Sequence, residues 1–224
     1  MKSICVFGDS LAKGVVLDSL KNRYTFLKDS FMSLVSQATG ISVSNYSKFG
    51  CDIVKGSDIL LKHADELSKY DYTFIEFGGN DCNFDWKSIS EHPDEEHQPL
   101  IPLDRFKSCY DKLIKEVRAF HANPVMLTLP PLDAQRFFDW VSKGNNPDNI
   151  LKWLGDVDHI FRWHRDYNDA VCEIAHENDV PLLDIRSTFT SMDDYTPYVC
   201  DDGMHYNSKG HKIIARQITD FCLA

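Results

Sequence analysis

Short apolar runs alternate along the chain with longer segments in which apolar residues recur every three or four positions. The short runs predict five strands, at 4–7, 41–46, 72–77, 125–129 and 180–185. The helical spacing of the longer segments predicts helices over 25–38, 53–67, 103–120, 158–177 and 208–221. Gly40 follows the first of these helices and is the residue type that commonly ends one.

The order of these segments predicts the fold class. Strands that are separated by helices are joined by crossovers, which make neighbouring strands parallel. We therefore expect an α/β fold, a three-layer α/β/α sandwich around a five-stranded, mainly parallel, doubly wound sheet. Ligands of such sheets bind beyond the carboxyl ends of the strands. The residues that directly follow each strand are thus the first place to look for a functional site.

Two segments, 82–102 and 130–156, fall outside this pattern. The second is rich in aromatic residues, which are Phe137, Phe138, Trp140 and Trp153. Long insertions of this kind form lids or walls of a substrate site, or they only shield the edges of a sheet, and both interpretations stay open here. We predict a single domain over 1–224 that carries these two insertions.

Composition and charge narrow the function classes. Hydrophobic residues make up 43% and charged residues 26% of the 224 residues, as in ordinary globular proteins. The formal net charge is −10 and the basic residues are scattered, which argues against nucleic acid and anionic membranes as partners. The seven cysteines include no C-x-x-C pair and indicate reduced thiols. With neither a secretory signal nor an apolar run of membrane-spanning length, a cytoplasmic location without integral membrane association is predicted. The pattern predicts no oligomeric state.

The turn after the first strand offers a candidate nucleophile. Gly8 permits a tight turn, after which the hydroxyl and the backbone N–H of Ser10 would both be exposed above the sheet. A nucleophilic serine is one interpretation of this turn. The other is that Ser10 caps a helix, which is the commoner role of a serine in such a place.

A base and its orienting acid follow the fifth strand. Asp202 precedes His205 by three residues, a spacing that lets the carboxylate reach imidazole Nδ1 within a turn. The carboxylate would then hold the imidazole in one tautomer and stabilise its protonated form. In the alternative interpretation Asp202 or Asn207 caps the last helix, and His205 is an exposed loop residue.

Two further strand-end loops offer donors for a developing oxyanion, which acyl transfer at a serine also requires. Gly50 could bring its backbone N–H close to a substrate, and the Asn80 side chain carries two N–H donors. Each of these residues alone is equally consistent with ordinary turn chemistry. Together, however, four separate loops present the nucleophile, the base with its acid, and the donors.

Three rival interpretations remain at this stage. A cysteine nucleophile, Cys51 or Cys82, could act with His205, although both residues suit apolar packing. A metal-dependent hydrolase would need more ligands than the single clear histidine beside the acidic residues at this sheet end. A non-catalytic binding module could use the same fold. No motif indicates a cofactor or a metal, and none is expected. The acidic residues at this sheet end, which the metal-dependent alternative would use, are Asp9, Asp52, Asp81, Asp201 and Asp202.

Four blocks of the chain resemble the SGNH hydrolase family, also called GDSL esterases and lipases. They are 7–11, the Gly50 loop, 78–81, and 202–205 with 210–211 downstream. The resemblance implies a flavodoxin-like fold, a Ser10–His205–Asp202 triad, and an oxyanion hole built from the Ser10 N–H, the Gly50 N–H and Asn80. The family often has proline directly after the catalytic histidine, where this chain has Tyr206.

The same resemblance implies a reaction. It is that of a serine ester hydrolase, in which Ser10 forms an acyl-enzyme with a small-molecule ester. We expect an acetylated carbohydrate or another small ester as the substrate. A lysophospholipid or other ester of a longer acyl chain is the main alternative.

Overall fold

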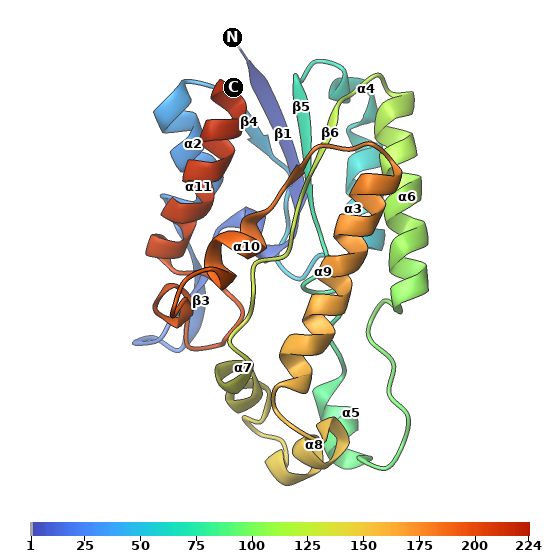
Figure 1. Cartoon of the computed structure of the whole chain (residues 1–224), viewed down its shortest axis with the longest axis vertical. Coiled ribbons are helices and arrows are strands. Elements are labelled where there is room, and N and C mark those ends of the chain that lie inside the picture. The colour runs from blue at the N-terminus through green and yellow to red at the C-terminus, as the bar shows by residue number, and fades with distance from the viewer. Residues whose placement is uncertain (1) are drawn as a thin grey trace.

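The computed structural model describes residues 2–224 and has a parallel sheet of five strands at its centre (Figure 1). The spatial order of the strands is β4-β1-β5-β6-β7, so β1 lies between β4 and β5. Every neighbouring pair is parallel, which confirms the predicted fold class. The strands are β1 (Ser3–Gly8), β4 (Ser42–Asn45), β5 (Tyr72–Glu76), β6 (Pro124–Leu127) and β7 (Leu182–Leu183).

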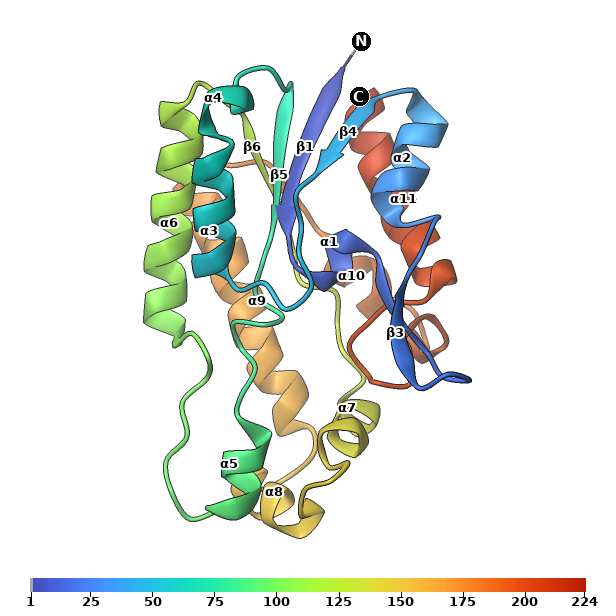
Figure 2. The same cartoon turned by 180° about the vertical axis from the view of Figure 1, so that it is seen from behind.

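Helices cover both faces of this sheet, because successive residues of each strand point to opposite sides. Ile4 and Val6 of β1 pack toward α2 and α11, whereas Cys5 and Phe7 pack toward α3, α6 and α9. Figure 2 shows these two helix layers from behind. The layers consist of α2 (Phe31–Thr39) and α11 (Ser208–Leu223) on one face, and α3 (Ile53–Lys62), α6 (Leu103–Ala119) and α9 (His159–Glu177) on the other.

The predicted start of the helix over 25–38 is wrong. Strands β2 (Val15–Asp18) and β3 (Arg23–Phe26) form an antiparallel hairpin there, and α2 begins only at Phe31. Ser30 caps α2 by accepting a hydrogen bond from the Ser33 N–H. Phe26 fits the helical spacing but is 65% exposed on the hairpin, because pairing with the earlier strand decides its conformation.

Other boundaries also differ from the predicted ones. The helix predicted over 53–67 is divided into α3 and a short α4 (Ala64–Leu67) by His63, whose φ of −113° is not helical. The fifth strand is shorter than predicted, because the Asp184 side chain accepts from the Ser187 N–H and starts α10 (Ile185–Thr190). Gly40 ends α2 in the left-handed conformation, as predicted.

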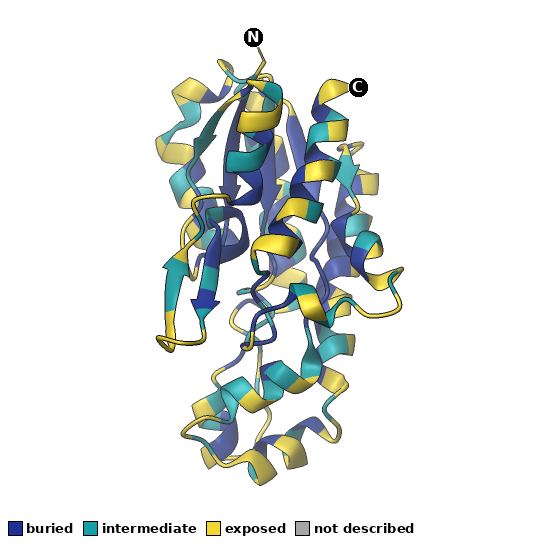
Figure 3. Cartoon of the chain, turned by 90° about the vertical axis from the view of Figure 1, so that its left-hand side faces the viewer, coloured by how far each residue is buried: buried dark blue, intermediate teal, exposed yellow. Residues whose placement is uncertain are grey.

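The two insertions fold into short helices beyond the carboxyl ends of the strands (Figure 1). They are α5 (Trp86–Glu91), α7 (Ala134–Val141) and α8 (Pro147–Leu154), which pack with the start of α9 around an apolar cluster of their own. Figure 3 contrasts the buried central strands with the β2–β3 hairpin, much of which is half-buried or exposed. The remaining helices are α1 (Ser10–Lys13) and the 3-10 turn η1 (Thr196–Tyr198). None of the helices in 2–224 combines the length and apolarity that crossing a bilayer requires.

Candidate active site

Ser10 lies at the first position of α1, directly after the turn that ends β1. The residue that caps this helix is Asp9, whose Oδ1 accepts from the Leu11 N–H at 2.8 Å. The Ser10 hydroxyl is therefore not used as a cap. Gly8 has no room for a side chain, because an added Cβ would lie 2.8 Å from Ala12 Cβ and 2.9 Å from the Glu76 carbonyl oxygen. The turn thus places Ser10 at the carboxyl end of β1.

Ser10, His205 and Asp202 form a continuous chain of hydrogen bonds. Ser10 Oγ lies 2.9 Å from His205 Nε2, and His205 Nδ1 lies 2.7 Å from Asp202 Oδ2. All three side chains are buried, and His205 is not the exposed loop residue of the alternative interpretation. Because the carboxylate accepts from Nδ1–H, Nε2 is free to accept the serine proton. The arrangement can therefore activate the Ser10 hydroxyl as a nucleophile.

Asp202 also organises its own loop. Its Oδ1 accepts from the backbone N–H groups of Met204 at 3.1 Å and His205 at 3.0 Å. Burial alone would raise the pKa of Asp202, but the hydrogen bonds from His205 and from these N–H groups outweigh it and lower the pKa. The carboxylate consequently stays ionised beside the imidazole. Asn207, not Asp202, caps α11 by accepting from the N–H groups of Lys209 and Gly210.

The loop that carries Asp202 and His205 is fastened to the second insertion. Gly203 has a φ of +73°, its carbonyl accepts from the Asp133 N–H at 2.8 Å, and an added Cβ would lie 2.3 Å from the Phe137 nitrogen. Tyr206, which stands where the family often has proline, is buried and donates its hydroxyl proton to the Pro131 carbonyl. The insertion therefore supports the position of His205.

The two donor loops reach the same region in different ways. Asn80 donates from Nδ2 to Asp9 Oδ2 at 3.0 Å and to the Cys51 carbonyl at 3.2 Å, so both amide hydrogens have partners. Gly50 is exposed with a φ of +67°, and the ring of its neighbour Phe49 stacks at 6.2 Å from the His205 ring. Among residues 2–224 neither the Gly50 N–H nor the Ser10 N–H has an acceptor.

A buried carboxyl pair, which the sequence pattern did not reveal, lies beneath Ser10. Glu76 at the end of β5 is 2% exposed, and its Oε2 lies 3.3 Å from the Asp9 backbone nitrogen. Burial, and then the charge on Asp9, raises the pKa of Glu76 well above its ordinary value. Burial raises the pKa of Asp9 as well, but both Asp9 oxygens accept hydrogen bonds, from the Leu11 N–H and from Asn80, so Glu76 is the group that keeps a proton. In the sequence Glu76 is an ordinary polar residue within a strand, and only its burial identifies it.

We predict that the Glu76→Gln variant is more stable than wild type, by a margin that grows as the pH rises. In the unfolded chain Glu76 ionises near pH 4.3, whereas the raised pKa keeps it protonated in the folded chain. The free energy of unfolding of wild type therefore falls above that pH. The variant avoids this loss, because glutamine cannot ionise. Thermal unfolding from pH 4 to pH 8 should show a gap that widens with pH in favour of the variant. Parallel curves across this range would contradict the protonated state of Glu76.

An aromatic rim, which we define as Tyr24, Phe49 and Trp140, lies beside His205. The Tyr24 ring lies 5.1 Å from those of His205 and Phe49 and 6.0 Å from that of Trp140. Burial, and then the charge of Asp202, raises the pKa of the Tyr24 phenol, which stays neutral. The sequence pattern did not single out Tyr24 or Phe49, because their packing against His205 leaves no local signal, and the hairpin that carries Tyr24 was predicted as part of a helix.

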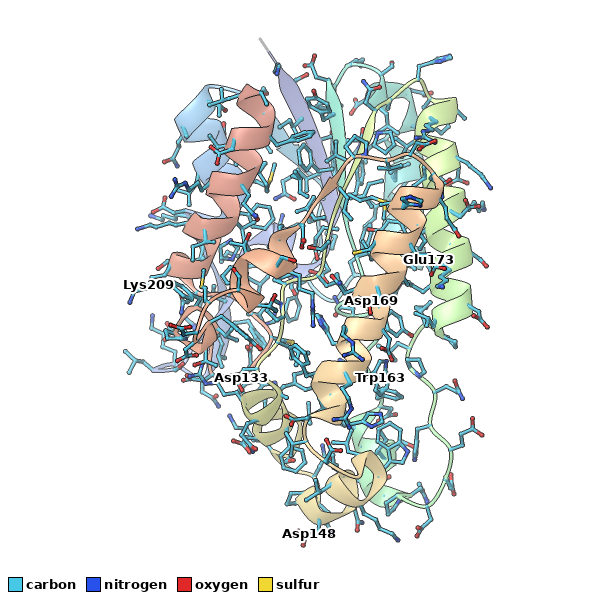
Figure 4. The ribbon with its side chains drawn as sticks, in the orientation of Figure 1. Asp133, Asp148, Trp163, Asp169, Glu173 and Lys209 are labelled. Carbon is cyan, nitrogen blue, oxygen red and sulfur yellow. The ribbon has the colours of Figure 1, made fainter. Side chains whose placement is uncertain are left out.

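A cavity of about 90 Å³ adjoins Ser10 and His205. Its other walls come from the first insertion, the segment that follows β6, and the start of α9, on which Figure 4 labels Trp163. These walls are mainly apolar, with Asn83 and His164 as polar members. They include Phe84, Trp86, Leu132, Phe137, Ile160 and Trp163.

The residues behind the rival interpretations have structural partners of their own. Asp52 caps α3, and Asp81 Oδ1 accepts from the Ile53 N–H at 2.8 Å, with burial raising the Asp81 pKa to about 7. Asp201 is exposed. Within 2–224 no group of three or more His, Cys, Asp or Glu residues is placed to hold a metal ion. Burial raises the pKa of the Cys51 thiol to about 12, which disfavours a thiolate nucleophile.

Comparison with known proteins finds relatives by sequence. Two plant proteins are similar over 146 residues, or 64% of this chain: GDSL esterase/lipase CPRD49 of Arabidopsis thaliana (26% identical) and GDSL esterase/lipase WDL1 of rice, Oryza sativa subsp. japonica (21%). The matched region spans about half the length of each relative (51% and 50%).

Solved structures share the fold at low sequence identity. A lipase/acylhydrolase from Enterococcus faecalis superposes with a TM-score of 0.70 at 19% identity, covering 99% of this chain and 95% of that one. A catalytic mutant of Axe2, an acetylxylan esterase from Geobacillus stearothermophilus, has a TM-score of 0.63 at 19% identity and covers 98% and 93%.

A match to a family sequence profile establishes the family of this chain. The profile of the GDSL-like lipase/acylhydrolase family matches residues 6–213, which include every strand of the sheet beyond the first residues of β1 and every residue of the Ser10–His205–Asp202 chain. The protein therefore belongs to the GDSL-like lipase/acylhydrolase family, and the predicted resemblance is confirmed.

Proposed function

We propose that this protein is a serine ester hydrolase in which Ser10, His205 and Asp202 act as a catalytic triad. The observation that carries the proposal is the hydrogen-bonded chain from Ser10 Oγ through the imidazole to the buried Asp202 carboxylate. This chain supplies a nucleophile, a base and an orienting acid at the carboxyl ends of the strands, where such folds bind ligands.

The reaction follows from these contacts. Ser10 Oγ attacks the ester carbonyl carbon while His205 Nε2 takes its proton, giving a tetrahedral oxyanion. His205 then returns that proton to the leaving alcohol, and an acyl-enzyme on Ser10 remains. A water molecule, deprotonated by His205, attacks the acyl carbon, and the acid is released as Ser10 recovers its proton. Asp202 stays ionised and stabilises the imidazolium in both halves.

The oxyanion is proposed to bind three donors. The Ser10 and Gly50 N–H groups have no acceptor in the described chain, which leaves them available for a substrate oxygen. Asn80 is the third donor, and to act it must share a hydrogen that the Cys51 carbonyl or Asp9 now accepts. Such donors stabilise charge that develops only in the transition state.

The substrate is proposed to be a small ester, with an acetylated carbohydrate preferred. Two observations support this choice. The cavity of about 90 Å³ is smaller than the roughly 300–1,000 Å³ of sites for larger ligands. The aromatic rim also suits stacking on a sugar face, and the structural neighbours include the Geobacillus acetylxylan esterase. We propose that both insertions of this single domain shape the substrate site.

An acyl-length series tests this function. With p-nitrophenyl esters from acetate to dodecanoate, we expect kcat/KM to be highest for acetate and to fall at least about tenfold by octanoate, since a cavity of about 90 Å³ has no room for the added methylenes. Rates that rise with acyl length would instead favour a lipase or lysophospholipase. No turnover at any length would favour a non-catalytic binding module.

Covalent labelling provides an independent readout for the nucleophile. A fluorophosphonate should form a bond between Ser10 Oγ and phosphorus, with fluoride leaving and the serine proton passing to His205. Peptide mass spectrometry should then find the phosphonyl group on the peptide that contains Ser10. Labelling elsewhere, at Cys51 or Cys82 for instance, would contradict the proposed nucleophile.

A further inference from the structure

A second buried histidine, His164 on α9, lines the same cavity as Ser10 and His205 but has no part in the proposed reaction. It is 7% exposed, and its Nδ1 lies 3.1 Å from Nη1 of Arg186. A guanidinium has only donors, so Nδ1 must be the acceptor in this bond. A neutral imidazole in this position therefore carries its hydrogen on Nε2.

Arg186 holds this arrangement rigidly. The guanidinium also donates to the Leu129 carbonyl at 3.2 Å and lies 5.0 Å from the centre of the Phe161 ring. Its backbone N–H donates to Thr128 Oγ1 at 2.9 Å, which fixes the start of α10 against β6. Burial, and then the charge of Arg186, lowers the pKa of His164 to about 3. The imidazole is thus neutral near pH 7, and the bond from Arg186 fixes its orientation.

The free N–H of His164 is open to the cavity. Its Nε2 has no hydrogen-bond partner within residues 2–224, and it is not among the unpartnered polar atoms that are closed off from solvent. Asn83 adds donors to the same cavity, because its Oδ1 accepts from the Phe84 N–H and from Trp86 Nε1, while its NH₂ group has no partner in the described chain. The cavity therefore combines aromatic walls with N–H donors.

We propose that His164, positioned by Arg186, binds substrate by donating its Nε2–H to an oxygen acceptor in the part of the ester that enters the cavity. The preferred ester would then carry a second oxygen, an ether or a hydroxyl, besides the ester group itself. This inference rests on the proposed ester hydrolysis. The second oxygen could belong to the alcohol, as in a sugar ring, or to the acyl group, and the chemistry that recognises it is the same.

Pairs of esters that differ by one oxygen test the proposal. Tetrahydropyran-4-yl acetate against cyclohexyl acetate probes the alcohol side, and p-nitrophenyl methoxyacetate against the butanoate probes the acyl side. For each pair the ratio of kcat/KM values is compared between wild type and His164→Phe, so that intrinsic reactivity cancels. We expect the variant to lower the ratio about tenfold in one arm, the usual effect of one lost hydrogen bond. The ester pair whose ratio falls shows whether the alcohol half or the acyl half of the ester enters the cavity.

Three controls sharpen this comparison. His164→Gln, which keeps a donor, should restore part of the ratio. His159→Phe alters an exposed histidine of the same helix and should leave the ratio at the wild-type value. Thermal unfolding checks that His164→Phe is folded. Equal ratios in wild type and His164→Phe in both arms would overturn the inference, whereas a wild type inactive on all four esters would overturn the proposed function.

A measurement on the wild-type protein does not depend on any variant. Nitrogen-15 NMR of histidine-labelled protein should show His164 as the neutral Nε2–H tautomer from pH 5 to pH 8. Where the alcohol half enters the cavity, tetrahydropyran-4-ol should shift its Nε2 resonance, and cyclohexanol should leave it unchanged. A protonated or Nδ1–H imidazole would overturn the inference even where the ester assays are inactive.

Discussion

Ser10→Ala is expected to lower kcat/KM on a short acyl ester by at least about 10⁴-fold, with the fold retained. The substitution removes the oxygen that bonds to His205 Nε2 at 2.9 Å, and no other hydroxyl bonds to that nitrogen in the described chain. The α1 cap should survive, because Asp9 and not Ser10 accepts from the Leu11 N–H. A spectrophotometric assay with p-nitrophenyl acetate measures the loss. Residual activity above the uncatalysed rate would come from the oxyanion donors, which the substitution leaves in place.

A second serine provides the control for this result. Ser57→Ala removes a half-buried hydroxyl of α3 that bonds only to the Ile53 carbonyl of its own helix, at 2.8 Å. Its activity should equal that of wild type. The double variant Ser10→Ala/His205→Ala should be little slower than Ser10→Ala, because the two residues act as a unit. A Ser10→Ala protein with activity near that of wild type would rule out the serine mechanism.

Asp202→Asn should lower kcat by about 10⁴-fold with little change in structure. The asparagine carbonyl can still accept from the N–H groups of Met204 and His205, which keeps the loop in place. Its NH₂ group would then face His205 Nδ1, where the carboxylate oxygen now lies at 2.7 Å. A donor in that position forces the hydrogen of the imidazole onto Nε2, so the ring can no longer take the Ser10 proton. The loss should appear in kcat, with KM nearly unchanged.

The neighbouring aspartate gives a matched control. Asp201 is exposed and Asp202 is fully buried, although the two differ by one position in the chain. Asp201→Asn makes the same chemical change and alters net charge equally, but it should leave kcat within about twofold of wild type, as surface substitutions usually do. Equal losses in both variants would show that charge at this end of the sheet, and not orientation of His205, supports catalysis.

Much of the fold could be predicted because burial of a strand or a helix leaves a local pattern. Strand β5 (Tyr72–Glu76) and helix α9 (His159–Glu177) lie within a residue or so of their predicted ranges, since β5 is a short run buried on both faces and α9 buries residues at helical spacing. The β2–β3 hairpin could not be predicted in the same way. Residues 23–26 adopt an extended conformation because they pair with 15–18, and their own spacing fits a helix equally well.

The residues of the candidate site also divide into those that the sequence predicts and those that it does not. Ser10, Asn80, Asp202 and His205 follow predicted strands, and the rule that ligands bind at strand ends was enough to single them out. The structure brings these four side chains together, and their catalytic roles stay predictions. Tyr24 and Phe49 were missed because a packing contact with His205 leaves no trace in the residues beside them.

The order of apolar and polar residues along this chain was sufficient to establish the doubly wound sheet, the strand-end loops and the residue types that those loops present. The tertiary structure alone assigned the α1 cap to Asp9, the proton to Glu76 and the free N–H to Nε2 of His164. The last two assignments depend on burial and on one partner far away in the chain: Asp9 and Glu76 are 67 positions apart, and His164 and Arg186 are 22. Where a proton resides is a property of the environment that folding creates, and no local spacing of residues encodes it.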